Sequence, residues 1–124
     1  MMLKNKKKGG GMELLIAILD KEEYFEKLIS LLAEVGARGA TIVDSEGVGH
    51  FLAHEVPIFA GLRHLVGEGK SVNKTILAVL DNKDIFARFK ELLAEENIDF
   101  TKPGVGVIVT VPVNEVVKSD EEFE

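Results

Sequence analysis

The chain has 124 residues, of which 46% are apolar and 29% charged, a composition typical of one soluble globular domain. It contains no cysteine, which excludes disulfides, thiolate chemistry and zinc sites with cysteine ligands. The net charge is −6 and no basic stripe is present. This argues against a nucleic-acid-binding protein, because phosphates attract clustered Lys and Arg side chains.

Residues 1–11 read MMLKNKKKGGG and precede the first strand-like segment. They are basic but lack the apolar core of a secretory signal, so we interpret them as a disordered leader or an expression-tag remnant and expect a cytoplasmic protein. The chain also lacks Gln and Trp and is rich in Glu and Lys. That bias is typical of proteins from thermophiles.

An apolar run over residues 14–19, rich in Leu and Ile, predicts the first β-strand. Asp20 follows it and is expected to be the N-cap of a helix, with Glu23 completing a capping box. Apolar residues then recur at helical spacing, and Gly36 is typical of a helix C-terminus. A second strand is predicted over residues 40–43.

A long connection over residues 46–73 follows the second strand. Unstructured connections of more than about 12–15 residues are usually functional or disordered. Pro57 suits the first position of a short helix. The segment carries more large apolar side chains than a solvated tip tolerates, so we expect them to pack on the body of the protein or to bind a partner. The predicted partner-binding residues are Ile58, Phe59, Leu62 and Leu65.

The next segment repeats the first strand and helix. When residues 77–97 are aligned with residues 16–36, eight of the 21 positions are identical, with Asp81 matching Asp20. We therefore expect Asp81 to cap the second helix and Asn97 to end it. The fixed offset across a strand, a cap and a helix indicates an internal duplication. A final strand, rich in β-branched residues, is predicted over residues 105–113.

A duplicated βαβ unit of this size predicts the α+β class and a ferredoxin-like βαββαβ fold. In that fold an antiparallel four-stranded sheet carries two helices on one face, and the long loop joins strands 2 and 3. The single domain would span residues 12–118, followed by an acidic tail over 119–124. Three of the four predicted strands are apolar on both faces, so the face without helices is expected to be buried by oligomerisation.

Catalytic residues cannot be assembled from this sequence, because its serines and histidines have no spacing typical of a nucleophile, a base and an orienting group. We therefore do not expect an enzyme. A metal site is the alternative reading of the three histidines, His50, His54 and His64. His50 and His54 would share one face of a helix, and Glu55 is a possible further ligand.

Two segments resemble the PII signal-transduction family, which is associated with nitrogen regulation. They are EVGARGATIVDSEGVGHF over residues 34–51 and KPGVGVIVTVPVNEVV over residues 102–117. The resemblance implies a homotrimer that binds an adenine nucleotide (ATP, ADP or AMP) in clefts between subunits. It also implies that the long loop, called the T-loop in that family, becomes ordered on binding and regulates a protein partner. Membrane transporters and metabolic enzymes are the usual partners in that family.

The resemblance also indicates the ligand-binding residues. Glycines let a backbone approach phosphate groups closely, and consecutive N–H groups can form an anion-binding nest. The positions that correspond to the family cleft are Gly39, Thr41, Gly47, Gly49, His50, Gly104 and Gly106.

The sequence also departs from the family pattern. Val107 stands where the family usually has Lys, and Lys118 is the only cation beyond the last strand. Arg38, Arg63 or Lys70 would have to compensate. The loop has no Tyr, so the family's tyrosine modification is not expected. Three alternatives therefore stay open: a metal-binding trimer resembling the CutA proteins, a degenerate PII-like protein without a nucleotide, and a small ferredoxin-like enzyme.

Overall fold

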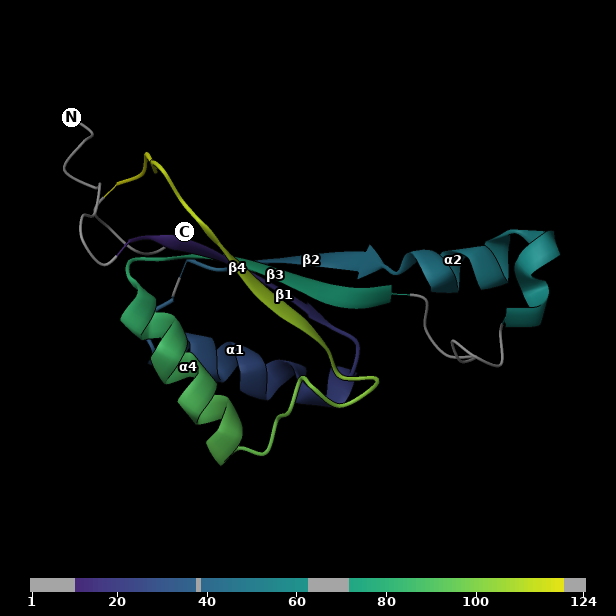
Figure 1. The fold of residues 1–124 in the computed structure, drawn as a ribbon, viewed down its shortest axis with the longest axis horizontal. Helices are drawn as coiled ribbons and strands as arrows, with labels where there is room; N and C mark the ends of the chain where they lie inside the picture. Colours follow the sequence, from purple (N-terminus) through teal and green to yellow (C-terminus); the bar gives the residue numbers. More distant parts are fainter. Residues whose placement is uncertain (1–10, 38, 63–71, 120–124) are drawn as a thin grey trace.

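The structure is a computed structural model that describes residues 11–37, 39–62 and 72–119. Within these ranges four strands form one antiparallel sheet in the order β2-β3-β1-β4 (Figure 1). The elements in chain order are β1 (Glu13–Leu19), η2 (Glu22–Tyr24), α1 (Phe25–Glu34), β2 (Thr41–Glu46), α2 (Val48–Glu55), η3 (Pro57–Leu62), β3 (Val72–Leu80), α4 (Lys83–Glu95) and β4 (Gly106–Pro112).

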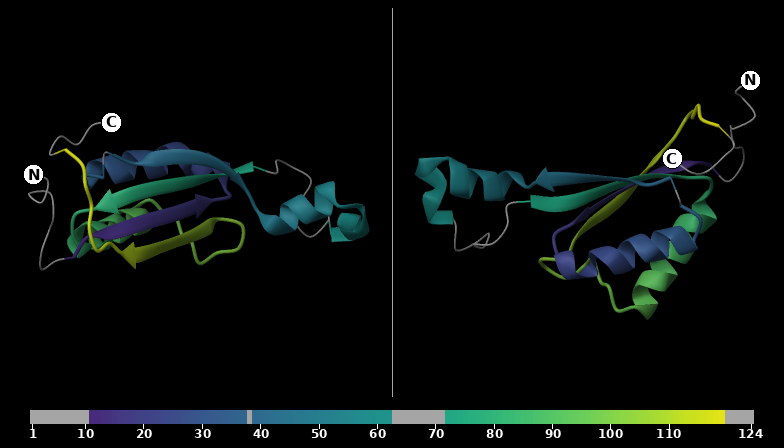
Figure 2. Two further views of the ribbon diagram at one scale, coloured as in Figure 1. Left: turned by 90° about the horizontal axis from the view of Figure 1, so that it is seen from above. Right: turned by 180° about the vertical axis from the view of Figure 1, so that it is seen from behind.

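The predicted ferredoxin-like fold is confirmed. The two strands that open the duplicated units, β1 and β3, pair with each other at the centre of the sheet, and β2 and β4 form its edges. Helices α1 and α4 both lie on one face of the sheet (Figures 1 and 2). The duplication therefore places the two similar βα units side by side, as a split βαβ arrangement requires.

The hydrophobic core lies between the two helices and the sheet. Alternate residues of the central strands point into it, because successive side chains of a strand face opposite sides of the sheet. Phe89 of α4 is the largest side chain that is fully buried. The other core residues of the strands and helices include Leu15, Ala17, Leu19, Leu28, Leu31, Leu32, Ile76, Ala78, Leu80, Leu92 and Leu93.

The opposite face of the sheet, which we call the open face, is apolar but uncovered. The pairing register aligns Ile16 of β1 with Leu77 of β3 and Val109 of β4 across this face. The β4 side chains Val107, Val109 and Val111 are 47%, 43% and 40% exposed. A row of half-exposed β-branched residues on a sheet face is unusual for a monomer and is consistent with the oligomerisation expected from the sequence.

The helix N-caps differ from the prediction. Asp20 does not cap a helix: its carboxylate accepts a hydrogen bond from Nδ2 of Asn73, at 2.8 Å, across the end of the sheet. Helix α1 instead begins through the 3-10 turn η2, and neither has a side-chain cap, so Glu23 closes no capping box. In the second copy Asn82, rather than Asp81, caps α4 by accepting from the backbone N–H of Ile85.

The predicted helix C-termini are confirmed. Gly36 after α1 has φ of +96° and Asn97 after α4 has φ of +61°. Both residues adopt the left-handed conformation, in which Gly and Asn carry the smallest steric cost. The duplicated positions therefore perform the same local function even though their side chains differ.

The connection between β2 and β3 forms a helical arm, which we define as residues 47–62. It contains α2 and η3, and η3 begins at Pro57 as expected. The arm projects away from the sheet, beyond the end of β2 (Figures 1 and 2). The helix over Val48–Glu55 was not predicted, and within it Ala53 is fully buried.

Residues 1–10, Arg38, 63–71 and 120–124 lie outside the described residues, so the predicted leader and most of the predicted acidic tail stay predictions. Within the described ranges, no helix combines the length and the apolar character needed to cross a bilayer. Met12, where the domain was expected to begin, is buried, and its carbonyl oxygen accepts from the N–H of Val113 at 3.0 Å.

We predict that Gly106→Ala destabilises the protein by about 3 kcal/mol. Gly106 has φ of +144°, and a Cβ atom there would lie 2.1 Å from the carbonyl oxygen of Ile18. The β1–β4 pairing would have to shift to accommodate it. Urea unfolding at one fixed protein concentration measures the change.

Gly104→Ala is the matched control. Gly104 also has a positive φ, +83°, but a Cβ atom there would meet nothing within 4 Å. We expect a loss of only about 1 kcal/mol for this backbone strain. Equal losses for the two variants would contradict the role assigned to the contact with β1.

Candidate functional site

The predicted ligand residues divide between the two edges of the sheet. The pairing register places Asp44 of β2, Lys74 of β3, Leu19 of β1 and Gly106 of β4 in one row across the sheet. This row marks the end of the sheet from which the helical arm projects. Both the start of α2 and the turn before β4 lie near this end, at opposite edges.

The β2 edge carries five of the predicted residues. Gly39 and Thr41 are exposed at the start of β2. Gly47 is the N-cap residue of α2, without a side-chain cap, and Gly49 and His50 belong to the first turn of that helix. The N–H groups of a first turn have no partner within the helix, and together they favour an anion. The Nδ1 atom of His50 is buried and has no hydrogen-bond partner among the described residues.

The β4 edge carries the remaining two, Gly104 and Gly106. The turn that holds them is fixed to the end of β1, because the carbonyl oxygen of Val105 accepts from the N–H groups of Asp20, at 2.8 Å, and Lys21, at 3.2 Å. Val107, the position of the expected family Lys, pairs with Ile18 and lies on the open face. It contributes apolar surface there rather than a cation.

A single chain does not bring these two groups together. Two central strands separate β2 from β4, which corresponds to roughly 14 Å between the edges at the usual strand spacing. Each group is instead exposed at its own edge. A ligand that contacts both groups therefore requires the β2 edge of one subunit to meet the β4 edge of another.

A polar network at the base of the arm was not predicted. On the open-face side, the hydroxyl of Ser45 contacts the side-chain oxygen of Asn73 and the hydroxyl of Thr75, the latter at 2.6 Å. Asn73 donates to Asp20. The network joins β1, β2 and β3 where the arm begins. The sequence gives no signal for it, because these residues meet only through the strand register.

The helix side of the same strand pair carries an ion pair. The Nζ atom of Lys74 donates to Asp44 at 2.7 Å, and this hydrogen bond raises the pKa of the Lys74 ammonium group. The same ammonium group lies 5.5 Å from the ring centroid of Phe25. The arm is thus anchored by polar contacts on both faces of the β2–β3 pair.

The predicted partner and metal residues lie on or beyond the arm. Ile58 is 83% exposed, and the side chains of Phe59 and Leu62 are not described. His64 and Leu65 lie outside the described residues. The rings of His50 and His54 stack with their centroids 4.3 Å apart. Within the described ranges, no group of three potential metal ligands is present, so a three-histidine site stays a prediction.

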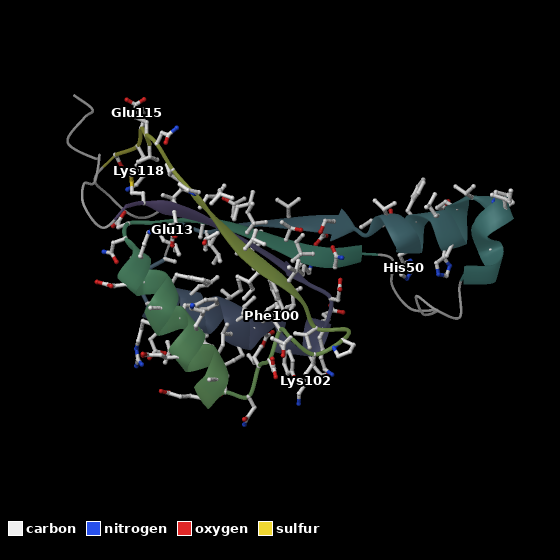
Figure 3. All side chains as sticks on the ribbon, in the orientation of Figure 1. Glu13, His50, Phe100, Lys102, Glu115 and Lys118 are labelled. Carbon is white, nitrogen blue, oxygen red and sulfur yellow. The ribbon has the colours of Figure 1, made fainter. Side chains whose placement is uncertain are left out.

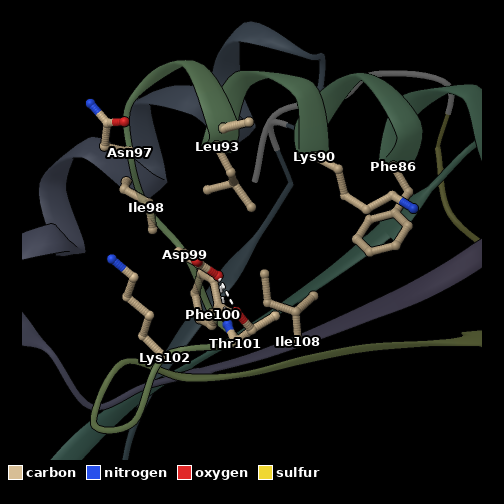
Figure 4. A pocket seen from close by; sticks show the side chains of 11 residues that line it. Phe86, Lys90, Leu93, Asn97, Ile98, Asp99, Phe100, Thr101, Lys102 and Ile108 are labelled. Atoms are coloured by element: carbon tan, nitrogen blue, oxygen red, sulfur yellow. Dashed lines mark hydrogen bonds between the residues drawn. The ribbon is translucent and has the colours of Figure 1, made fainter.

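A cavity on the helix side of the sheet was also missed. It lies between α4 and the β4 edge and has a volume of about 610 Å³ (Figure 4). Figure 3 shows two of its residues, Phe100 and Lys102, below the sheet and away from His50 on the arm. The sequence signal that could have indicated this cavity is the helical spacing of Phe86, Lys90 and Leu93, which places them on one face of α4.

Comparisons with known proteins identify the fold. The chain is 17% identical to Arabidopsis thaliana PII bound to citrate, with a TM-score of 0.58 over 88% of this chain and 83% of that one. The chain has the PII fold. It is also 19% identical to the B. subtilis GlnK–ATP complex, with a TM-score of 0.54 over 86% of this chain and 87% of that one. No family model matches the sequence, and the search of curated proteins found no match.

The resemblance seen in the sequence is thereby confirmed at the level of the PII fold. The similarity spans most of both chains and therefore concerns the fold of the whole domain. The ligand, the assembly and the partner of this chain are a separate question.

Proposed function

We propose that this protein is a PII-like trimeric signalling protein that binds a small anion, an adenine nucleotide, in clefts between subunits. Ligand binding would change the position of the helical arm, which would then engage or release a protein partner in the cytoplasm. The proposal is for a regulator rather than an enzyme. The observation that carries it is that the start of α2 and the turn with Gly104 and Gly106 lie at opposite edges of the sheet, near the same end.

The open face supports the trimeric assembly. An apolar sheet face needs a cover, and packing the open faces of several subunits together would supply it. Such packing leaves the β2 and β4 edges of adjacent subunits free to face each other. The start of α2 and the Gly104 turn would then line one cleft, which neither subunit forms alone.

The chemistry of the two groups supports an anion. The β2 edge offers the unpaired N–H groups at the start of α2, and the β4 edge offers a glycine turn with little steric bulk. The two solved structures of similar fold hold citrate and ATP, both of which are anions. Because Val107 provides no charge, we expect this cleft to rely on backbone N–H groups and on cations from the neighbouring subunit.

The exposed apolar residues of the arm support the proposal of a protein partner. Val48, Phe51 and Ile58 are 74%, 45% and 83% exposed on an element that stands away from the body. Apolar side chains presented in this way mark interaction surfaces. The described part of the arm is already helical, so we propose that the ligand repositions it rather than folds it. A transporter or a metabolic enzyme is the class of partner that the resemblance implies.

We predict that the protein is a trimer and that Val109→Glu converts it to a monomer. The substitution places a charge on the open face, midway along the edge strand β4, where assembly would bury it without a partner. Light scattering at micromolar concentration measures the mass. Lys83→Glu, an exposed position at the start of α4, is the control and should remain trimeric. A monomeric parent protein would contradict the proposal.

We predict that ATP or ADP binds with micromolar affinity and that Gly104→Asp abolishes binding, whereas Gly104→Asn weakens it only severalfold. Both side chains tolerate the positive φ at this position, but only Asp places a negative charge beside the phosphates. Isothermal titration of the metal-free protein with ATP, ADP, AMP and cyclic dinucleotides measures this. Equal effects of Asp and Asn would argue against an anion at this turn, and no binding of any of them would refute the nucleotide.

A metal-binding trimer is the second candidate, and the placement of two histidines one turn apart on α2 favours it, although the stacked rings would have to rotate before their nitrogen lone pairs could meet at one ion. His50 and His54 lie one turn apart on α2, and their rings are 4.3 Å apart with an angle of 19° between planes. Two imidazoles at this helical spacing can bind one Zn²⁺ or Cu²⁺ ion, and ligands from elsewhere would complete the coordination. This candidate uses the same arm and predicts regulation by metal instead of nucleotide.

If the metal site exists, we predict that His54→Ala removes stoichiometric Zn²⁺ or Cu²⁺ binding. His64→Ala, which leaves the helical pair intact, distinguishes a two-histidine site from the three-histidine site expected from the sequence. Retained binding in His64→Ala supports the pair on α2. Unchanged binding in His54→Ala would contradict any site on this helix.

A further inference from the structure

The cavity between α4 and β4 has the features of a second ligand site. Its floor is apolar and its volume, about 610 Å³, is within the range of small-molecule pockets, roughly 300–1,000 Å³. It is built by α4, the segment after it and the edge strand β4 (Figure 4). The apolar lining consists of Phe86, Leu93, Ala94, Ile98, Phe100 and Ile108.

The position of β4 at the edge of the sheet explains why the cavity exists. Ile108 pairs with the buried Ala17, so its side chain lies on the helix face of the sheet. No described strand lies beyond β4 to extend this face. Helix α4 covers it from one side only, and Ile108 stays partly exposed. The core therefore opens to the surface here.

The basic side chains of α4 near the cavity differ in whether they form an ion pair. On α4, Arg88 pairs with Glu91 at 3.0 Å. Lys90 points instead toward the cavity, with its ammonium group 4.9 Å from the ring centroid of Phe86, and it has no ion pair among the described residues (Figure 4). In a chain with a net charge of −6, an unpaired cation beside an apolar floor favours an amphipathic anion.

Several other polar groups of the cavity are already paired. The Asp99 carboxylate accepts from the N–H and the hydroxyl of Thr101, at 2.9 and 2.6 Å, and these hydrogen bonds hold the pKa of Asp99 below its usual value. The backbone N–H groups of Ile98 and Lys102 donate to carbonyl oxygens of the chain. The ammonium group of Lys102, which also lines the cavity, has no ion pair among the described residues. Phosphate prefers a nest of backbone N–H donors, which this lining does not offer, so lysine side chains beside an apolar floor fit a carboxylate better.

We propose that this cavity binds an amphipathic monocarboxylate, with the carboxylate at Lys90 and the hydrocarbon part against Phe86 and Ile108. The proposal is separate from the nucleotide cleft. Ile108 faces the helices, whereas its neighbours Val107 and Val109 face the open side of the sheet. The cavity lining includes none of the predicted cleft residues, so the two sites are distinct, although Lys102 lies two positions before Gly104.

The test is titration of the full chain with octanoate and with octylammonium, which share a hydrocarbon tail and differ in charge. We expect sub-millimolar binding of octanoate and at least about fivefold weaker binding of octylammonium. Amide chemical shifts in NMR should move at Phe86, Phe100 and Ile108. Shifts at Val109 instead would place the probe on the open face and overturn the proposal.

Variants with a matched control locate the carboxylate. Lys90→Glu should weaken octanoate about tenfold, because one attraction is lost and one repulsion is added. Lys83→Glu makes the same charge change on the same helix outside the cavity and should alter affinity less than about twofold. Equal effects of the two variants would overturn the proposal by showing only general electrostatics.

A third variant fills the cavity without touching the core. Ala94 is exposed and lines the cavity, so Ala94→Trp should abolish octanoate binding while the thermal unfolding curve stays unchanged. Octanoate binding that survives this substitution overturns the proposal. Failure of octanoate to bind the parent protein also overturns the proposal. If the Ala94→Trp assembly then dissociates in light scattering, a second copy of the chain is the occupant of the cavity.

Discussion

The central strands β1 and β3 are largely apolar on both faces, and the residues that the structure describes place two helices, both on one side, to cover them. One face receives α1 and α4 and becomes the core, with Leu15, Ile76 and Phe89 fully buried. The other face keeps its half-exposed valines on β4. Most of the proposed function depends on this imbalance, since the described residues leave this apolar face uncovered, and further copies of the chain would bury it.

The uncovered open face also explains why the edges of the sheet matter for the proposed ligand cleft. If open faces pack together, edges of neighbouring subunits meet, and residues that lie about three strand spacings apart in one chain become neighbours in the assembly. The glycine turn before β4 is held in place for this, because Val105 is hydrogen-bonded to the end of β1 and Gly106 has no room for a Cβ atom. The α2 end is anchored through Ser45 and Asn73.

The sequence was sufficient to predict the fold because the duplication repeats a complete βα unit, and both copies follow strand and helix periodicity. The helix N-caps were predicted wrongly because hydrophobic periodicity does not determine which polar residue accepts the hydrogen bonds of the first turn. The Asp20 carboxylate accepts a hydrogen bond from Asn73, which lies 53 positions further along the chain. A local sequence pattern cannot show such a contact. Helix α2 was missed because Gly47 and Gly49 favour a turn, whereas burial of Ala53 stabilises a helix.

The candidate site was predictable only in part for a related reason. Gly104 and Gly106 were recognised by their spacing, and the structure gives both a positive φ, so the backbone itself requires these residues. The Ser45, Asn73 and Asp20 network depends on strand register and was invisible in the sequence. It lies between the turn at Asp20 and the start of the arm, and both of its ends adjoin a proposed ligand group. A ligand that moves either group therefore acts on hydrogen bonds that hold the base of the arm, which gives the arm a physical connection to the cleft.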